Sequence, residues 1–126
     1  MNPARTVLAV FVGYLALLVL GVLGELLLLS ILRGQTTGSS VMIAHEAVAF
    51  IAGIIAGAVT ARMAPSRRLS HATALALTII SATVLATALA KPPVHALFPS
   101  WYPYALALFS GVGAFGGGAL VSGWVE

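Results

Sequence analysis

The stretch "AHEAVAFIAGIIAGAVTARM", residues 44–63, decides the fold of this chain, because it is long and apolar enough to cross a lipid bilayer. A membrane-spanning helix needs about 20 mainly apolar residues to cross a hydrocarbon core of about 30 Å. Small residues recur along it at helical spacing, as at Gly53 and Gly57, and membrane helices use small residues to pack closely. The stretch therefore predicts a membrane helix packed against another helix. It also begins with His45 and Glu46, whose polar side chains the hydrocarbon excludes.

The composition of the whole chain favours the same class of protein. Of its 126 residues, 60% are hydrophobic and only 7% are charged, whereas a soluble domain carries about 25% charged residues. The formal net charge is +3, but the basic residues lie between apolar segments without interleaved aromatics, so we expect no nucleic-acid partner. The absence of cysteine excludes disulfides and thiolate metal sites. We expect one membrane domain over residues 1–126.

Four segments are long and apolar enough to span the membrane, and they cover residues 6–32, 41–64, 69–90 and 101–122. Ser40 is a suitable N-cap for the second helix, and Pro65 is expected to end it. The last two helices are separated by a segment that contains three prolines, residues 91–100. The sequence thus predicts an all-α, polytopic membrane protein folded as a bundle of four transmembrane helices.

The basic residues of the short connections set the expected orientation. The four predicted spans place four basic residues on one side of the membrane: Arg5, Arg62, Arg67 and Arg68. They place Arg33 and Lys91 on the other side. Because the cytoplasmic side carries the excess of Lys and Arg, both termini are expected to be cytoplasmic. An even number of spans agrees with both termini lying on one side.

Two ladders of small residues predict which helices pack most closely. The predicted packing positions are Gly53, Gly57, Ser110, Ala114 and Gly118. Lipid tails are as apolar as leucine, so membrane helices associate by close packing and by hydrogen bonds between helices. We therefore expect the helices over 41–64 and 101–122 to form the centre, and the leucine-rich helix over 6–32 to be more exposed to lipid.

Several motifs of the last two thirds of the chain resemble those of a known group. A glycine ladder closes on "AGAVTARMAPSRR", residues 56–68, and "FPSWYPYALALFSGVGAFGGG", residues 98–118, opens and forms the last helix. This pattern is similar to that of widespread, uncharacterised, small bacterial four-span membrane proteins. The resemblance implies a four-helix fold in the bacterial cytoplasmic (inner) membrane, and it implies no activity.

Polar residues inside the predicted spans gather near the outer ends of the first two helices. Glu25 lies about 10 Å inside the outer end of its helix, and Glu46 about 8 Å inside the same end of the next helix. We therefore predict that the two carboxylates approach each other in the outer half of the membrane. His45, Lys91 and His95 are expected to supply positive charge or hydrogen-bond donors to this candidate polar cluster.

The chemistry of the candidate polar cluster has three interpretations. A structural, hydrogen-bonded cluster is favoured, and a site for protons or a small solute is the alternative. Metal binding is disfavoured, because the adjacent residues His45 and Glu46 diverge by about 100° on a helix and the Glu-x-x-His spacing of metal bundles is absent. We expect no metal, no cofactor and no enzyme, since no nucleophile–base pair or cofactor motif occurs. His71 is expected to be a solvated histidine beside the inner arginines.

Two functional hypotheses follow from these patterns. The first is a non-catalytic packing or accessory subunit of a membrane complex, because the ladders are long and little of the chain lies outside the spans. The second is a small oligomeric channel or transporter that uses the candidate polar cluster as its entrance. The expected partners are the lipid bilayer and either other membrane protein subunits or further copies of this chain.

Overall fold

Four long helices form the protein in a computed structural model, which describes residues 2–33, 38–90 and 99–123. They are α1 (Pro3–Ile31), α2 (Ser39–Met63), α3 (Arg68–Leu89) and α4 (Tyr102–Gly123), and the described residues contain no strand. Each helix is long and apolar enough to cross a membrane. The structure thus confirms the predicted all-α bundle of four helices and has the architecture of a multi-pass membrane protein.

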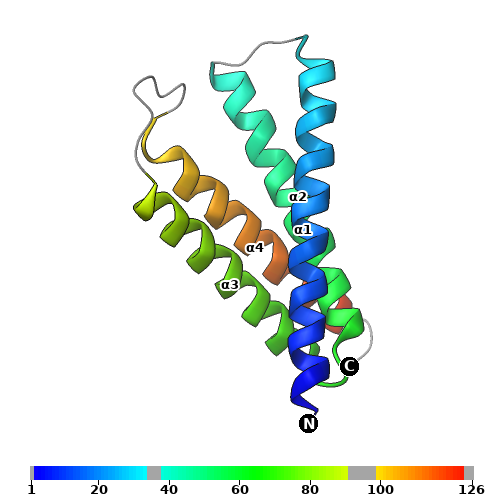
Figure 1. Cartoon of the computed structure of the whole chain (residues 1–126). Coiled ribbons are helices and arrows are strands. Elements are labelled where there is room, and N and C mark those ends of the chain that lie inside the picture. The colour runs from blue at the N-terminus through cyan, green and yellow to red at the C-terminus, as the bar shows by residue number, and fades with distance from the viewer. Residues whose placement is uncertain (1, 34–37, 91–98, 124–126) are drawn as a thin grey trace.

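Consecutive helices run in opposite directions, so the start of α1 and the end of α4 lie at the same end of the bundle (Figure 1). That end also receives the turn between α2 and α3. We call it the arginine end, because it carries Arg5, Arg62, Arg67 and Arg68. The side of the membrane that this end faces stays a prediction.

The starts of the first two helices differ from the predicted ones. The helix α1 begins at Pro3, because the Asn2 side chain accepts a hydrogen bond from the Ala4 N–H at 3.1 Å and proline suits the first helical position. The prediction that Ser40 caps α2 is wrong. Gly38 holds the N-cap position with φ of 114°, a backbone conformation that favours glycine, and Ser40 lies inside the first turn.

A short turn joins α2 to α3. The helix α2 ends at Met63, one residue before the predicted end, because Pro65 favours an extended conformation at Ala64, whose ψ is 130°. Arg67 adopts the left-handed conformation, with φ of 46° and ψ of 54°, directly before α3 begins. The other predicted bounds of α3 and α4 differ from the observed ones by one residue. The turn places two adjacent arginines at the end of the bundle.

The helices α2 and α4 share the most extensive contact of the bundle. Gly53 lies against the backbone of Ser110, and Gly57 lies against the backbone of Ala114, so closely that a Cβ atom at either glycine would overlap a carbonyl oxygen of α4. Both glycines are buried, and the Ala114 side chain is fully buried. The predicted packing positions of the two helices therefore face one another.

A second set of glycines, on α4, lies close to the backbone of α2. Gly113 and Gly117 of α4 lie against the backbone of α2 at Phe50 and Ile54. The ring of Phe50 also meets the ring of Phe109 edge to face, with centroids 6.4 Å apart. Each helix thus offers glycines to the other helix's backbone, which places the two axes unusually close together.

The remaining helices pack around this pair. Gly118 of α4 lies against Ala72 of α3, so this predicted packing residue mainly contacts α3. Leu75 and Ile79 of α3 are the largest fully buried apolar side chains near the centre of the bundle. The helix α1 packs its first half onto this core through Val10, Tyr14 and Leu17. Most of its other large apolar side chains are exposed.

Candidate functional site

A histidine–carboxylate pair joins α1 and α2 in the halves of these helices that lie away from the arginine end. The His45 Nδ1 atom lies 2.9 Å from the Glu25 Oε1 atom, so the ring N–H can donate a hydrogen bond to the carboxylate. The neighbouring Gly24 lets α1 approach the side chain of Val48 closely. The side chain of His45 is 21% exposed and that of Glu25 is 46% exposed, so the pair is open on one side.

The third helix at this site is α4, which contributes its first residue. The phenol of Tyr102 lies within electrostatic reach of both Glu25 and Glu46, and Tyr102 is only 5% exposed. Tyrosines are enriched at the boundary between membrane and water. The polar groups therefore lie at the level where α4 starts. The end of a membrane-spanning helix is expected near the membrane surface, where a charged group costs much less than at mid-depth. This level explains why a membrane helix tolerates His45 and Glu46.

The structure describes some of the predicted members of the candidate polar cluster and leaves others outside the described residues. The structure brings Glu25 and His45 together across two helices. The predicted approach of Glu25 to Glu46 stays a prediction, although both carboxylates lie around Tyr102. Lys91 and His95 lie outside the described residues. Sequence reasoning did not include Tyr102 in the candidate polar cluster, although Tyr102 stands at the start of α4, at the same end of the bundle as the start of α2.

The arrangement favours hydrogen bonding over metal binding. Among residues 2–33, 38–90 and 99–123, no three His, Cys, Asp or Glu side chains converge as a metal site would require. The imidazole of His45 and the carboxylate of Glu25 can hold α1 to α2 and can share a proton along their hydrogen bond. The pair is thus suited to a structural role or to proton handling.

At the arginine end, His71 forms a second link between helices. It is 4% exposed, so the prediction of a solvated interfacial histidine is wrong. Its Nδ1 atom lies 3.0 Å from the Arg67 carbonyl oxygen, and its Nε2 atom lies 3.2 Å from the Thr6 hydroxyl. A carbonyl can only accept, so Nδ1 carries the hydrogen. The single hydrogen of the Thr6 hydroxyl has two acceptors in reach, Nε2 of a neutral His71 ring and the Asn2 carbonyl oxygen at 3.4 Å. The start of α1 covers the ring, which the sequence alone does not reveal.

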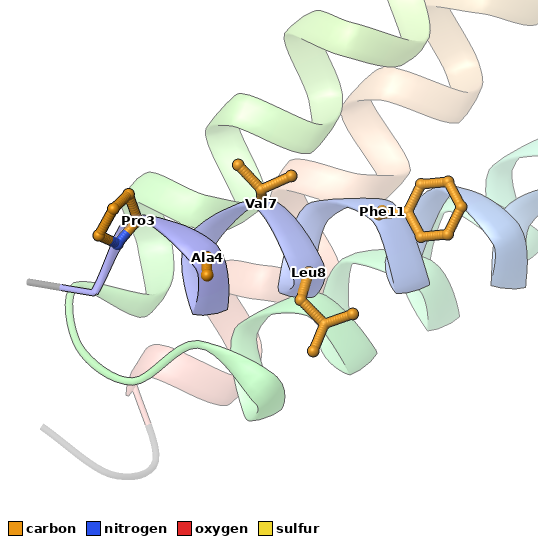
Figure 2. A pocket seen from close by; sticks show the side chains of 5 residues that line it. All are labelled: Pro3, Ala4, Val7, Leu8 and Phe11. Carbon is orange, nitrogen blue, oxygen red and sulfur yellow. The ribbon is translucent and has the colours of Figure 1, made fainter.

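Hollows occur on the surface of the described helices, and three of them lie on α1, between α2 and α4, and on α3. The first, of about 470 Å³, lies along the first three turns of α1, and Figure 2 shows its five lining side chains projecting from that helix: Pro3, Ala4, Val7, Leu8 and Phe11. The second is a groove of about 510 Å³ between α2 and α4, lined by Phe50, Ile54, Gly116, Ala119, Leu120 and Gly123. All eleven side chains that line these first two hollows are apolar or absent, so neither of the two offers a group for acid–base or nucleophilic catalysis.

Comparison of the chain with protein-family models, with curated proteins and with solved structures finds no match. The resemblance to small bacterial four-span membrane proteins therefore remains an expectation from the sequence motifs. The function has to be argued from the contacts within this chain.

Proposed function

We propose that the protein is a non-catalytic packing or accessory subunit of a membrane complex, located in the bacterial cytoplasmic membrane. Its partner binds in the α2–α4 groove, which is defined by the six residues given above. That partner is a transmembrane helix of another subunit or of a second copy of this chain. The main support is the pair of glycines in this groove, Gly116 and Gly123, against which no other described residue packs closely.

The six glycines of α4 fall into two groups. Four of them lie against α2 or α3: Gly111, Gly113, Gly117 and Gly118. At Gly116 and Gly123, by contrast, an added Cβ atom would meet nothing within 4 Å. A glycine inside a helix costs about 0.5–1 kcal/mol relative to alanine. We infer that a further helix packs closely against Gly116 and Gly123. This contact explains the presence of glycine there, as the contacts with α2 and α3 explain the other four glycines.

Filling the α2–α4 groove is expected to abolish partner binding without unfolding the protein. The double variant Gly116→Leu, Gly123→Leu places two large side chains where the structure has open space. The matched control is Gly21→Leu on α1, because a Cβ atom there also meets nothing within 4 Å. Each form is purified with an affinity tag from native membranes in mild detergent, and co-purifying proteins are identified.

We expect the unaltered chain and the Gly21 variant to retain the same partner, and the double variant to lose it. A second, differently tagged copy of this chain serves to detect self-association in the same experiment. Retention of every partner by the double variant, or a monomer without companions in all forms, would refute the proposal.

The Glu25–His45 pair supports a second candidate function, that of a small oligomeric channel or transporter for protons or small solutes. A carboxylate that is 46% exposed and bonded to an imidazole near the membrane surface can accept and release a proton. In this function the pair forms the entrance, and Tyr102 of α4 limits its depth.

The variant Glu25→Gln separates the two candidate functions. The Gln side-chain oxygen can still accept a hydrogen bond from His45, so the fold is expected to persist, whereas Glu25→Ala removes the acceptor and costs about 1–2 kcal/mol of stability. If the pair handles protons, proton flux into liposomes that contain the protein is expected to vanish in Glu25→Gln. A liposome assay without any flux by the unaltered protein would eliminate the transport function and leave the packing function standing.

A further inference from the structure

We propose that the arginine end of the bundle binds an anionic phospholipid, with the phosphate held by arginines and one acyl chain lying in the hollow on α1. Four arginines gather here: Arg5 on α1, Arg62 in the last turn of α2, and Arg67 and Arg68 at the start of α3. The two acids that the structure describes, Glu25 and Glu46, lie toward the other end. No described residue therefore forms an ion pair with these arginines.

The buried histidine brings the arginines of α1 and α3 together. The ring of His71 bonds the Arg67 carbonyl through one nitrogen and the Thr6 hydroxyl through the other. Arg5 is the neighbour of Thr6, so one imidazole fixes the backbones that carry Arg5 and Arg67 close to each other. Arginine is suited to phosphate, because its planar guanidinium donates two parallel hydrogen bonds to two phosphate oxygens.

The four arginines lie at the same end of the bundle as the apolar surface of the hollow on α1. This surface is long enough to contact the first carbons of an acyl chain. The hollow on α1 extends from Pro3 to Phe11, about 12 Å along the helix axis. It begins at the first residue of α1, at the arginine end, and follows a face of α1 that is exposed at Val7, Leu8 and Phe11 (Figure 2). Its volume is about 470 Å³, and every lining side chain is apolar.

This combination selects a lipid over a soluble phosphate. A soluble phosphate would use the arginines alone and would leave the hollow on α1 without a role. A phospholipid places a negative charge at the membrane surface and an apolar chain directly below it, which matches both parts of the site. Each arginine near the surface favours an anionic headgroup by about fivefold, as about 1 kcal/mol per cation implies.

The test measures lipid retention by the full chain with native mass spectrometry. The protein in detergent is titrated with phosphatidylglycerol or with phosphatidylcholine of the same acyl chains. We expect at least a tenfold preference for phosphatidylglycerol, which falls as the ionic strength rises. Equal retention of the two lipids by the unaltered protein would overturn the proposal without the need for any variant.

Variants then locate the site. The triple variant Arg5→Gln, Arg67→Gln, Arg68→Gln is expected to lose most of the preference for phosphatidylglycerol. The matched control is Arg33→Gln, because Arg33 follows α1 at the opposite end of the bundle and its loss is expected to leave the preference unchanged. An equal loss in the control variant would mean that net charge, and not this site, causes the preference.

Two further measurements keep the charge constant. Ala4→Phe fills the hollow on α1 and is expected to reduce the retention of phosphatidylglycerol several-fold, so unchanged retention would overturn the assignment of the acyl chain.

Inorganic phosphate and deacylated glycerophosphoglycerol serve as soluble competitors. We expect neither to displace the lipid at millimolar concentration, and displacement by either would assign the arginines to a soluble phosphate.

Discussion

Replacement of Gly57 by leucine is expected to destabilise the bundle by about 1–3 kcal/mol or more, since overpacking of a tight interface carries that cost. Even the first atom of the new side chain, its Cβ, would overlap the backbone of Ala114. A backbone carbonyl in the middle of a helix cannot move aside as a flexible side chain can. The helices α2 and α4 would have to separate, and their other contacts, including those of Gly53 and Gly113, would weaken together.

Thermal unfolding in detergent, followed by tryptophan fluorescence or circular dichroism, measures this effect. The matched control is Gly116→Leu, which makes the same change of residue on α4 at a place with open space. We expect the control to keep the melting temperature of the unaltered protein. If Gly57→Leu is as stable as the control, the two helices do not pack through these glycines.

The second large effect is expected at the contact between α1 and α2. A Cβ atom at Gly13 would overlap the hydroxyl of Thr60, whose side chain is fully buried. Thr60 is fully buried, so any rotation of its side chain away from α1 would have to displace other packed groups. The variant Gly13→Ala should push α1 off the bundle at a cost of about 1–3 kcal/mol. The control Gly21→Ala, two turns further along α1, meets open space and should be neutral or slightly stabilising.

A double-mutant cycle can assign the cost of Gly13→Ala to Thr60. The hydroxyl of Thr60 has no hydrogen-bond partner among the described residues, so Thr60→Ala removes no hydrogen bond and should cost little. The double variant Gly13→Ala, Thr60→Ala should then be more stable than the sum of the two single changes predicts, by about 0.5–3 kcal/mol. Strict additivity would place the source of the strain elsewhere.

The sequence predicted the number of helices and most of their ends, because both depend on local properties. Length and apolarity define each span, and Pro65 ends α2 wherever the rest of the chain lies. Ser40 failed as a cap because Gly38 reaches the required position two residues earlier, with a backbone conformation that serine rarely adopts. Helical spacing also placed Gly53 and Gly57 on one side of α2 without reference to other helices.

The partners of the polar residues were less predictable, because they depend on rotations and crossing points that no local pattern encodes. Depth along the helix predicted that Glu25 would approach Glu46 with His45 as a nearby donor, and the structure shows the contact of Glu25 with His45. The burial of His71 depends on α1 lying over α3, which brings Thr6 to a residue 65 positions away. Tyr102 lies near the Glu25–His45 pair because α4 begins at the same level of the bundle as this pair.

The close contact of α2 with α4 also constrains the order in which the protein can be made. During synthesis α2 is complete long before α4 emerges, and α3 lies between them in the chain. Until α4 enters the membrane, the glycine face of α2 lacks the helix against which it packs in the complete bundle. The nascent chain therefore depends on the 22-residue helix α4 to close the four-helix bundle, and ribosome stalling or truncation before α4 would leave a three-helix intermediate open to misassembly or proteolysis.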